Sequence, residues 1–309
     1  GVCDFNEITE LSGSLREKLS NRFYIYTANI IEKYSSNKDG TARYILGLED
    51  KNVIECVLIK QEFRNTICVS TQIGCRFNCS FCASALKGFI RNLKCSEILE
   101  QFLAVKKDLG LERINNVVFM GMGEPLDNTE NLIKAIRVLN SKYGMIIGMR
   151  KITVSSCGLV DGIKRLIESR ITPELSISLH APDDKIRNIL MPVNKRFRIE
   201  DLIKIAKEYT QKTKRLVTFE YVLIKDINDS PLHARKLVKL LKSFKCKINL
   251  IVYNSVKALH YQSPHPSAVK SFYGILKSNG ISVTIRSSRG EDIDAACGQL
   301  RLRYLNGIV

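Results

Sequence analysis

The chain of 309 residues lacks several patterns that would place it in a common class of protein. No apolar run reaches the roughly 18 residues that a transmembrane helix needs, and no basic segment followed by an apolar one opens the chain as in a signal peptide. No Gly-x-Gly-x-x-Gly opens a helix, which argues against a dinucleotide-binding fold. We therefore expect a cytoplasmic protein with no membrane partner.

Acidic residues are also scarce. The sequence has 31 Asp and Glu residues against 48 Lys and Arg, a formal net charge of +17. The basic excess is spread along the chain and is not gathered in one tail, as expected of a surface that meets a polyanion. The composition therefore favours a nucleic acid as partner.

Alternating and periodic apolar residues predict an α/β protein. Residues 8–20 have the spacing of an amphipathic helix, and residues 42–49 and 52–60 alternate like a β-hairpin. Further along, strand-like runs alternate with helical stretches; these runs are 65–70, 115–121, 151–156, 174–179, 216–224 and 247–254. Six such repeats predict a parallel sheet, either a barrel, a partial barrel or an open doubly wound sheet.

Residues capable of chemistry follow each of these runs. They are Cys75, Gly123 and Glu124, Ser155 and Ser156, His180, Lys225 and Asp226, and Asn254. Barrel enzymes build their active sites at the carboxyl ends of the strands. Turn residues also collect at strand ends, so their position alone leaves the functional and the structural interpretation open.

A loop after the first run carries three cysteines as Cys-x3-Cys-x2-Cys: Cys75, Cys79 and Cys82. A structural zinc site needs four ligands, usually in two pairs, and the chain has no second Cys-x2-Cys pair. Three thiolates suit a 4Fe-4S cluster whose fourth iron stays open to the amino and carboxylate groups of a methionine. The spacing favours the cluster over zinc.

The run VVFMGMGEPLDN ends in a glycine-rich turn that contains Gly123 and Glu124. Glycine lets the backbone approach a ligand closely because it has no Cβ. The turn is either a tight loop or, beside the three-cysteine loop, a binding site for a methionine amino group.

These motifs resemble the radical-SAM adenosine methyltransferases of RNA, the RlmN and Cfr family. The most specific segments are ICVSTQIGCRFNCSFCAS, FMGMGEPLDN, SISLHAPDDKIRNILMPVN, EYVLIKDINDS, KINLIVYN and DIDAACGQL. The resemblance implies a partial (βα)6-type radical-SAM barrel, with S-adenosylmethionine and a 4Fe-4S cluster as cofactors. It divides the chain into the tail of a truncated N-terminal helical domain (1–22), a β-hairpin extension (23–62), the catalytic domain (63–300) and a C-terminal tail (301–309). Gly1 in place of Met is consistent with a missing N-terminal part.

The resemblance also implies the reaction. It is methylation of C2 of an adenosine in 23S ribosomal RNA, in the peptidyl-transferase region, and of the adenosine 3′ of the transfer RNA anticodon. Pro125 in GMGEP matches the C2-methylating branch, whereas the C8-methylating Cfr branch tends to Ala there. Further expectations are a one-electron reductant such as flavodoxin or ferredoxin, and a monomer.

Three residues match catalytic positions of the family. Cys297 matches the cysteine that carries the methyl group, Cys68 the one that resolves the protein–RNA adduct through a disulfide with Cys297, and Glu55 a proton acceptor. From the residues alone, Cys68 would be a buried core thiol and Glu55 a solvent-facing strand residue. Matching S-adenosylmethionine contacts are Gly123, Glu124, Ser155, Ser178, Leu179, His180 and Asn254. Cys3, Cys56, Cys95, Cys157 and Cys246 match no role and are taken as structural.

Two alternatives remain open at this point. The chain could be another radical-SAM enzyme, one that acts on a peptide or inserts sulfur, but such an enzyme has no need of a methyl-carrying cysteine. It could also be a noncatalytic RNA-binding module that contains zinc or a cluster.

Overall fold

The computed structural model describes residues 2, 4–25, 27–86, 88–110, 112–256 and 258–300. The described part forms a ten-stranded sheet in the order β1-β2-β3-β4-β7-β8-β9-β10-β11-β12. The strands are β1 Asn29–Ser35, β2 Ala42–Gly47, β3 Val53–Gln61, β4 Arg64–Cys68, β7 Asn116–Phe119, β8 Ile152–Ser156, β9 Glu174–Ser178, β10 Thr218–Leu223, β11 Lys247–Val252 and β12 Ser282–Arg286. From β4 to β12 all neighbours are parallel, whereas β1 to β4 pair antiparallel.

The predicted parallel sheet is confirmed, and the barrel is only partial. In the described residues β1 and β12 are the two ends of the strand order and do not pair with each other. The six predicted runs correspond to β4, β7, β8, β9, β10 and β11. A seventh parallel strand, β12, was not predicted, because its five residues are mostly exposed and lack a buried apolar run.

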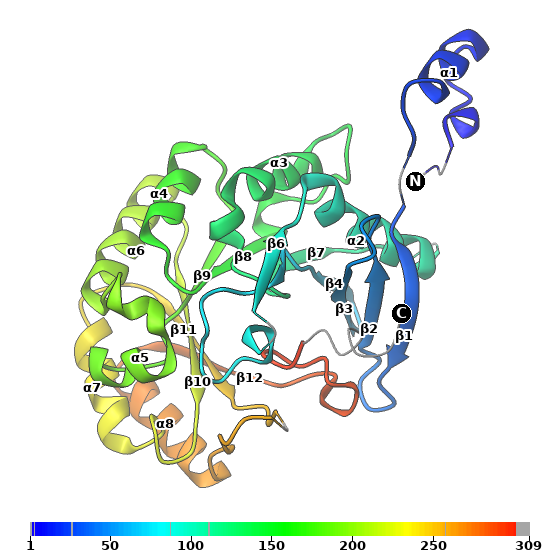
Figure 1. Ribbon diagram of the computed structural model, residues 1–309. Coiled ribbons are helices and arrows are strands. Elements are labelled where there is room, and N and C mark those ends of the chain that lie inside the picture. The colour runs from blue at the N-terminus through cyan, green and yellow to red at the C-terminus, as the bar shows by residue number, and fades with distance from the viewer. Residues whose placement is uncertain are drawn as a thin grey trace.

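Helices cover the outer face of the sheet (Figure 1). They are α2 Cys95–Leu109, α3 Thr129–Asn140, α4 Val160–Glu168, α5 Asp184–Leu190, α6 Ile199–Thr213, α7 Pro231–Leu241 and α8 Pro266–Ser278. Their buried residues recur at helical spacing, as Leu132, Ile136 and Leu139 do in α3, so each packs one apolar stripe on the sheet. The inner face of the curved sheet stays available for a site.

Short elements shape the loops at the strand ends. The 3₁₀ helices are η1 Phe5–Glu7, η2 Ala83–Ala85, η3 Pro125–Asn128, η4 Met149–Lys151, η5 Pro192–Lys195 and η6 Glu291–Ile293. A separate hairpin of β5 (Gln72–Gly74) and β6 (Phe89–Asn92) frames the three-cysteine loop. Gly74 has φ +72°, and a Cβ there would lie 1.8 Å from the carbonyl oxygen of Gly88. Only glycine allows this close crossing where the loop begins.

The N-terminal segment differs from its prediction. The helix α1 spans Gly13–Ser20, not 8–20, because Ser12 caps it by accepting a hydrogen bond from the backbone of Leu15. None of its residues is buried, and Figure 1 shows it projecting from the sheet. The predicted hairpin is confirmed as β2 and β3, and β3 pairs onward with β4, so it continues the main sheet. Cys3 and residues 301–309 lie outside the described residues.

No helix in the described part of the chain combines the length and the apolar character that a membrane crossing requires.

Candidate active site

A cavity lies at the carboxyl ends of the parallel strands, where the sequence predicted a site; we call it the cysteine cavity. Predicted residues that line it are Cys75, Cys79, Cys82, Gly123, Glu124, Ser155, Ser178, His180, Asn254 and Cys297. Glu55, Cys68 and Leu179 are not in its lining. Strands far apart in the sequence thus bring most of the predicted side chains to one place.

The three thiols of the cysteine loop are free and partly exposed to this cavity. Burial raises the pKa of Cys75 to about 12 and also raises the pKa of Cys79 and Cys82. Among the described residues, no three His, Cys, Asp or Glu side chains are grouped closely enough to hold one metal ion. Three soft thiols on one short loop fit a cluster, in which each thiolate binds a different iron.

The glycine-rich turn between β7 and η3 places Glu124 beside the cysteine loop. Gly123 has φ +95°, and a Cβ there would lie 2.5 Å from that of Gln72. The Glu124 carboxylate accepts hydrogen bonds from the backbone N–H of Leu126 (3.0 Å) and of Cys157 (2.6 Å). Burial raises the pKa of Glu124. The carboxylate is therefore fixed at the cavity wall, where it can accept a hydrogen bond from an ammonium group.

His180 follows β9 in a left-handed conformation, with φ +54°. Its Nδ1 accepts a hydrogen bond from the backbone N–H of Val222 at 3.0 Å, and the ring of Phe81 packs against it edge-on. Burial lowers the pKa of His180 to about 3. The imidazole is therefore neutral at physiological pH, and because Nδ1 accepts, Nε2 carries the proton.

The fully buried Arg187 of α5 was not singled out in the sequence, although its guanidinium holds the cavity wall together. It donates to the carbonyl oxygens at the ends of β8 and β9; these bonds are to Cys157 (2.8 Å), Ser178 (3.1 Å) and Leu179 (3.2 Å). Burial lowers the pKa of Arg187 to about 10. Leu179 is thus buried, and its carbonyl oxygen accepts a hydrogen bond from Arg187. A charged residue in a helix carries no sequence signal that it is buried.

The C-terminal segment brings Cys297 to the cavity. The N–H of Ala83 donates to the carbonyl of Gly298 at 2.8 Å, and the hydroxyl of Ser84 donates to the carbonyl of Leu300 at 2.9 Å. Asn254, at the end of β11, donates from its side-chain amide to the carbonyl oxygen of Cys297 at 3.3 Å. These bonds hold an exposed thiol over the cysteine loop.

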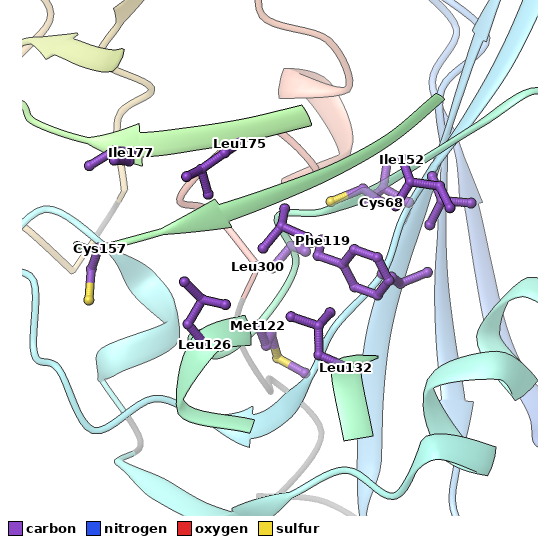
Figure 2. Close-up of a cluster of buried hydrophobic side chains, with 14 of the residues drawn as sticks. Cys68, Phe119, Met122, Leu126, Leu132, Ile152, Cys157, Leu175, Ile177 and Leu300 are labelled. Carbon is purple, nitrogen blue, oxygen red and sulfur yellow. The ribbon is translucent and has the colours of Figure 1, made fainter. Parts of the chain in front are cut away.

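Cys68 lies at the end of β4 in the apolar core. Figure 2 shows it near Ile152 and Phe119, with Cys157 at the other end of the same row of buried side chains. Burial raises the pKa of Cys68 to about 12, and the nearby charge of Cys297 adds to the effect. Cys68 is therefore a buried core thiol, as its residue type suggests, and it is also close enough to Cys297 to interact with it.

Glu55 does not face solvent, which the residue pattern alone had suggested. It is 1% exposed on β3, and its carboxylate lies 4.0 Å from the guanidinium of Arg43, which is also buried. Cys157, taken as structural, is buried but lines the cysteine cavity. Alternation along a strand does not reveal that both faces of β3 are covered.

Two charged residues of the cavity lining were missed, Glu220 of β10 and Arg286 of β12. Oε1 of Glu220 accepts hydrogen bonds from Ser176 (3.0 Å) and Asn249 (3.1 Å), and burial raises its pKa. The sequence did carry a signal for Glu220, since it is a Glu inside the apolar run FEYVL. A charged residue in a buried strand is rarely there for packing.

Comparisons with known proteins agree with this geometry. The family model described as "Radical SAM superfamily" matches residues 69–238. Over 304 residues the chain is 46% identical to the "Probable dual-specificity RNA methyltransferase RlmN" of Thermoanaerobacter sp., covering 98% of this chain and 88% of the relative. Its Clostridium acetobutylicum counterpart is 45% identical over 305 residues, with 99% and 88% covered. The chain belongs to the RlmN family.

Solved structures extend the likeness to three dimensions. The crystal structure of a radical SAM methyltransferase from Sphaerobacter thermophilus superposes with a TM-score of 0.92 at 39% identity, over 97% of this chain and 89% of that one. SuiB of Streptococcus suis, at 18% identity and a TM-score of 0.52, shares the fold. Membership of the RlmN family makes the chain a radical-SAM RNA methyltransferase, and the radical-SAM family implies S-adenosylmethionine and a 4Fe-4S cluster as cofactors.

Proposed function

We propose that the chain methylates C2 of an adenosine in 23S ribosomal RNA and of the adenosine 3′ of the transfer RNA anticodon, with Cys297 as the methyl carrier. One observation carries the proposal: the exposed thiol of Cys297 faces the same cavity as Cys75, Cys79 and Cys82. A radical enzyme that only abstracts hydrogen needs no fourth thiol at that place.

The chemistry of the base explains why a carrier is needed. Adenine C2 lies between two ring nitrogens and is electron-poor, so it cannot attack the methyl group of S-adenosylmethionine directly. A cluster held by Cys75, Cys79 and Cys82 would supply the electron that cleaves S-adenosylmethionine to a deoxyadenosyl radical. A radical formed on an S-methyl group can add to C2, and the thiolate of Cys297 can acquire that methyl group from another S-adenosylmethionine, releasing S-adenosylhomocysteine.

The second cysteine completes the reaction. After the methylene group has joined C2, the adduct radical loses one electron, which the oxidised cluster would accept, and the thiolate of Cys68 removes the C2 proton. Once this proton has been passed on, the Cys68 thiolate attacks the sulfur of Cys297. As the disulfide between Cys68 and Cys297 forms, the bond between the methylene carbon and sulfur breaks. Its electron pair stays on the carbon, which takes up a proton and becomes the methyl group. The nearby positions of Cys68 and Cys297 support this role. Glu55, buried beside Arg43, is proposed as the acceptor that carries the proton away.

The choice of C2 over C8 rests on Pro125. This residue is buried, begins η3 and lines the cysteine cavity next to Glu124. We further propose that Gly123, Glu124, Ser155, Ser178, His180 and Asn254 bind S-adenosylmethionine, that flavodoxin or ferredoxin supplies the electron, and that the protein acts as a monomer.

Mass spectrometry of nucleosides tests the proposal. Protein reconstituted without oxygen is incubated with S-adenosylmethionine, a reductant, and transcripts of transfer RNA or 23S ribosomal RNA. The expected product is 2-methyladenosine. Accumulation of 8-methyladenosine would assign the Cfr reaction, and cleavage of S-adenosylmethionine with no methylated RNA would point to a different radical-SAM task.

A further inference from the structure

A second cavity lies on the inner face of the sheet, toward the amino ends of β4, β7 and β8. Its volume is about 620 Å³, and we call it the arginine cavity. The cationic residues in its lining are Arg64, Arg150, Lys151, Arg286 and Arg289. Hydroxyl and amide side chains of the strands, such as Thr66, Asn116, Thr153 and Thr284, line the space between them.

Most cations of this cavity have no carboxylate partner among the described residues, whereas Arg286 interacts with Glu220. None of the described residues in its lining is acidic. Arg64 donates only to the amide oxygen of Gln61, and Arg289 to the carbonyl of Lys60; in the described structure neither forms a salt bridge, nor do Arg150 and Lys151. Cations held together in this way repel one another, so an anion that joins them lowers the repulsion and is attracted to the cavity.

Some arginines elsewhere in the described structure form salt bridges. Arg91 donates to Glu97 at 2.7 Å and pairs with Asp50 at 2.6 Å, and Arg196 pairs with Asp161 at 2.7 Å. The arginine cavity is a place where several cations face a common space without carboxylates.

The arginine cavity also adjoins the cysteine cavity. Ile251, Asn254, Arg286 and Cys297 line both. Cys297 thus separates a space that contains the three-cysteine loop from a space lined by cations. A nucleobase placed in the arginine cavity would meet the Cys297 thiol from the side opposite to Cys75, Cys79 and Cys82.

An exposed aromatic residue stands at the same end of the sheet. Phe63, in the turn between β3 and β4, is 87% exposed and directly precedes Arg64. Basic grooves that bind single-stranded nucleic acids pair cations for the phosphates with aromatic side chains for the bases.

From these observations we propose that the arginine cavity binds the sugar-phosphate backbone around the target adenosine. The base reaches Cys297 from the amino-terminal end of the partial barrel. Arg64, Arg150, Lys151 and Arg289 contact phosphates, and Phe63 stacks on a neighbouring base. This inference rests on the proposed function in one respect, the RNA substrate, and adds to it the surface and the direction of approach. An extruded base loses its stacking, and phosphate contacts close to its attachment point offset that cost.

A pair of matched double variants tests the proposal. R150A/K151A removes two cations of the arginine cavity, and K164A/R165A removes the same residue types from the exposed face of α4. Binding of a transfer RNA transcript and of a 23S ribosomal RNA hairpin is measured by fluorescence anisotropy over a range of salt concentrations. R150A/K151A should weaken binding about tenfold and reduce the slope of log K against log salt by about 1.4–1.8, the value for two phosphate contacts. K164A/R165A should match the wild type.

A second variant tests whether the base enters through the arginine cavity, and it leaves the charge of that cavity unchanged. Thr284 is exposed on β12 and lines the arginine cavity, so Thr284→Trp should narrow it. Methylated RNA should fall at least tenfold, whereas methylation of Cys297 in the absence of RNA should persist.

The outcomes separate the two proposals. A wild-type protein that neither binds nor methylates either RNA contradicts the proposed function itself. If the wild-type protein binds and methylates RNA, and R150A/K151A binds it as tightly as K164A/R165A does, only the proposal that the arginine cavity binds RNA is overturned. Equal yields of methylated RNA from Thr284→Trp and the wild type would overturn the direction of approach.

Discussion

The side-chain amide of Asn254 donates a hydrogen bond to the carbonyl oxygen of Cys297, and its oxygen accepts another from the hydroxyl of Ser288. Both groups of the amide are therefore used to hold the C-terminal segment against the end of β11. Asn254 matched a contact to S-adenosylmethionine in the sequence, and the structure gives it a positioning task as well.

Substitution of Asn254 should loosen Cys297 without changing the cysteine loop. One hydrogen bond contributes about 1 kcal/mol, so Asn254→Ala should slow methylation of Cys297 about fivefold or more. Iron content should equal that of the wild type. Ser288→Ala removes only the hydrogen bond from Ser288 to the side-chain oxygen of Asn254, so it should slow methylation of Cys297 less. Mass spectrometry of the Cys297 peptide over time measures both, and an unchanged rate in Asn254→Ala would remove its positioning role.

Arg187 should be a determinant of stability. Arg187→Met keeps much of the apolar volume but leaves the carbonyls of Cys157, Ser178 and Leu179 without their donor in a buried place. Each unsatisfied buried acceptor costs about 1–3 kcal/mol, so the free energy of unfolding should fall by at least about 3 kcal/mol.

The exposed Arg196 provides the matched control for this substitution. Its surface ion pair with Asp161 is worth about 1 kcal/mol or less. Urea denaturation of Arg187→Met and Arg196→Met compares the two, and equal losses would contradict the account of Arg187.

The pKa of His180 predicts how stability depends on pH. Burial lowers it from 6.5 to about 3, so below pH 6.5 the unfolded chain takes up a proton that the folded chain does not. The contribution is complete above pH 6.5 and is lost as the pH falls toward 3. At a pH of about 5 the loss amounts to about 2 kcal/mol.

Denaturation curves at neutral and at acid pH measure this effect. His180→Gln should remove about 2 kcal/mol of the difference between them. His260→Gln, at an exposed position, should leave the difference as in the wild type. If both variants keep the wild-type pH dependence, His180 is not held neutral.

Loss of any one cysteine of the loop should reduce cluster content. Cys75→Ala, Cys79→Ala and Cys82→Ala each remove one of three thiolates, so iron and the broad absorbance of the cluster should fall together. Cys246→Ala removes a buried thiol that does not line the cysteine cavity and should retain both. Full iron content in all three loop variants would contradict the assignment of the ligands.

Local patterns predicted those parts of the protein that local interactions determine. The six runs from β4 to β11 were recognisable because each is a short apolar stretch followed by turn residues. The spacing of Cys75, Cys79 and Cys82 was the basis for predicting a cluster, which stays a prediction. The resemblance to a family then supplied roles that spacing could not, above all those of Cys68 and Cys297.

Features that depend on distant contacts were not predicted. The burial of Arg187 depends on the ends of β8 and β9 lying side by side, and the burial of Glu55 depends on Arg43 from the neighbouring strand. The strand β12 is identified by its pairing with β11, since its own residues are mostly exposed. The start of α1 was misplaced because the capping hydroxyl of Ser12 outweighs the apolar spacing before it.

The most direct test of the central claim is denaturing gel electrophoresis of labelled RNA after reaction with two single variants. Cys68→Ala should still receive the methyl group and add it to the base. It cannot resolve the adduct, so protein joined to RNA through Cys297 should accumulate as a slowly migrating band. Cys297→Ala should give no such band and no methylated RNA, although S-adenosylmethionine is still cleaved. Normal turnover by Cys68→Ala, or a crosslinked band in Cys297→Ala, would contradict the roles assigned to the two cysteines.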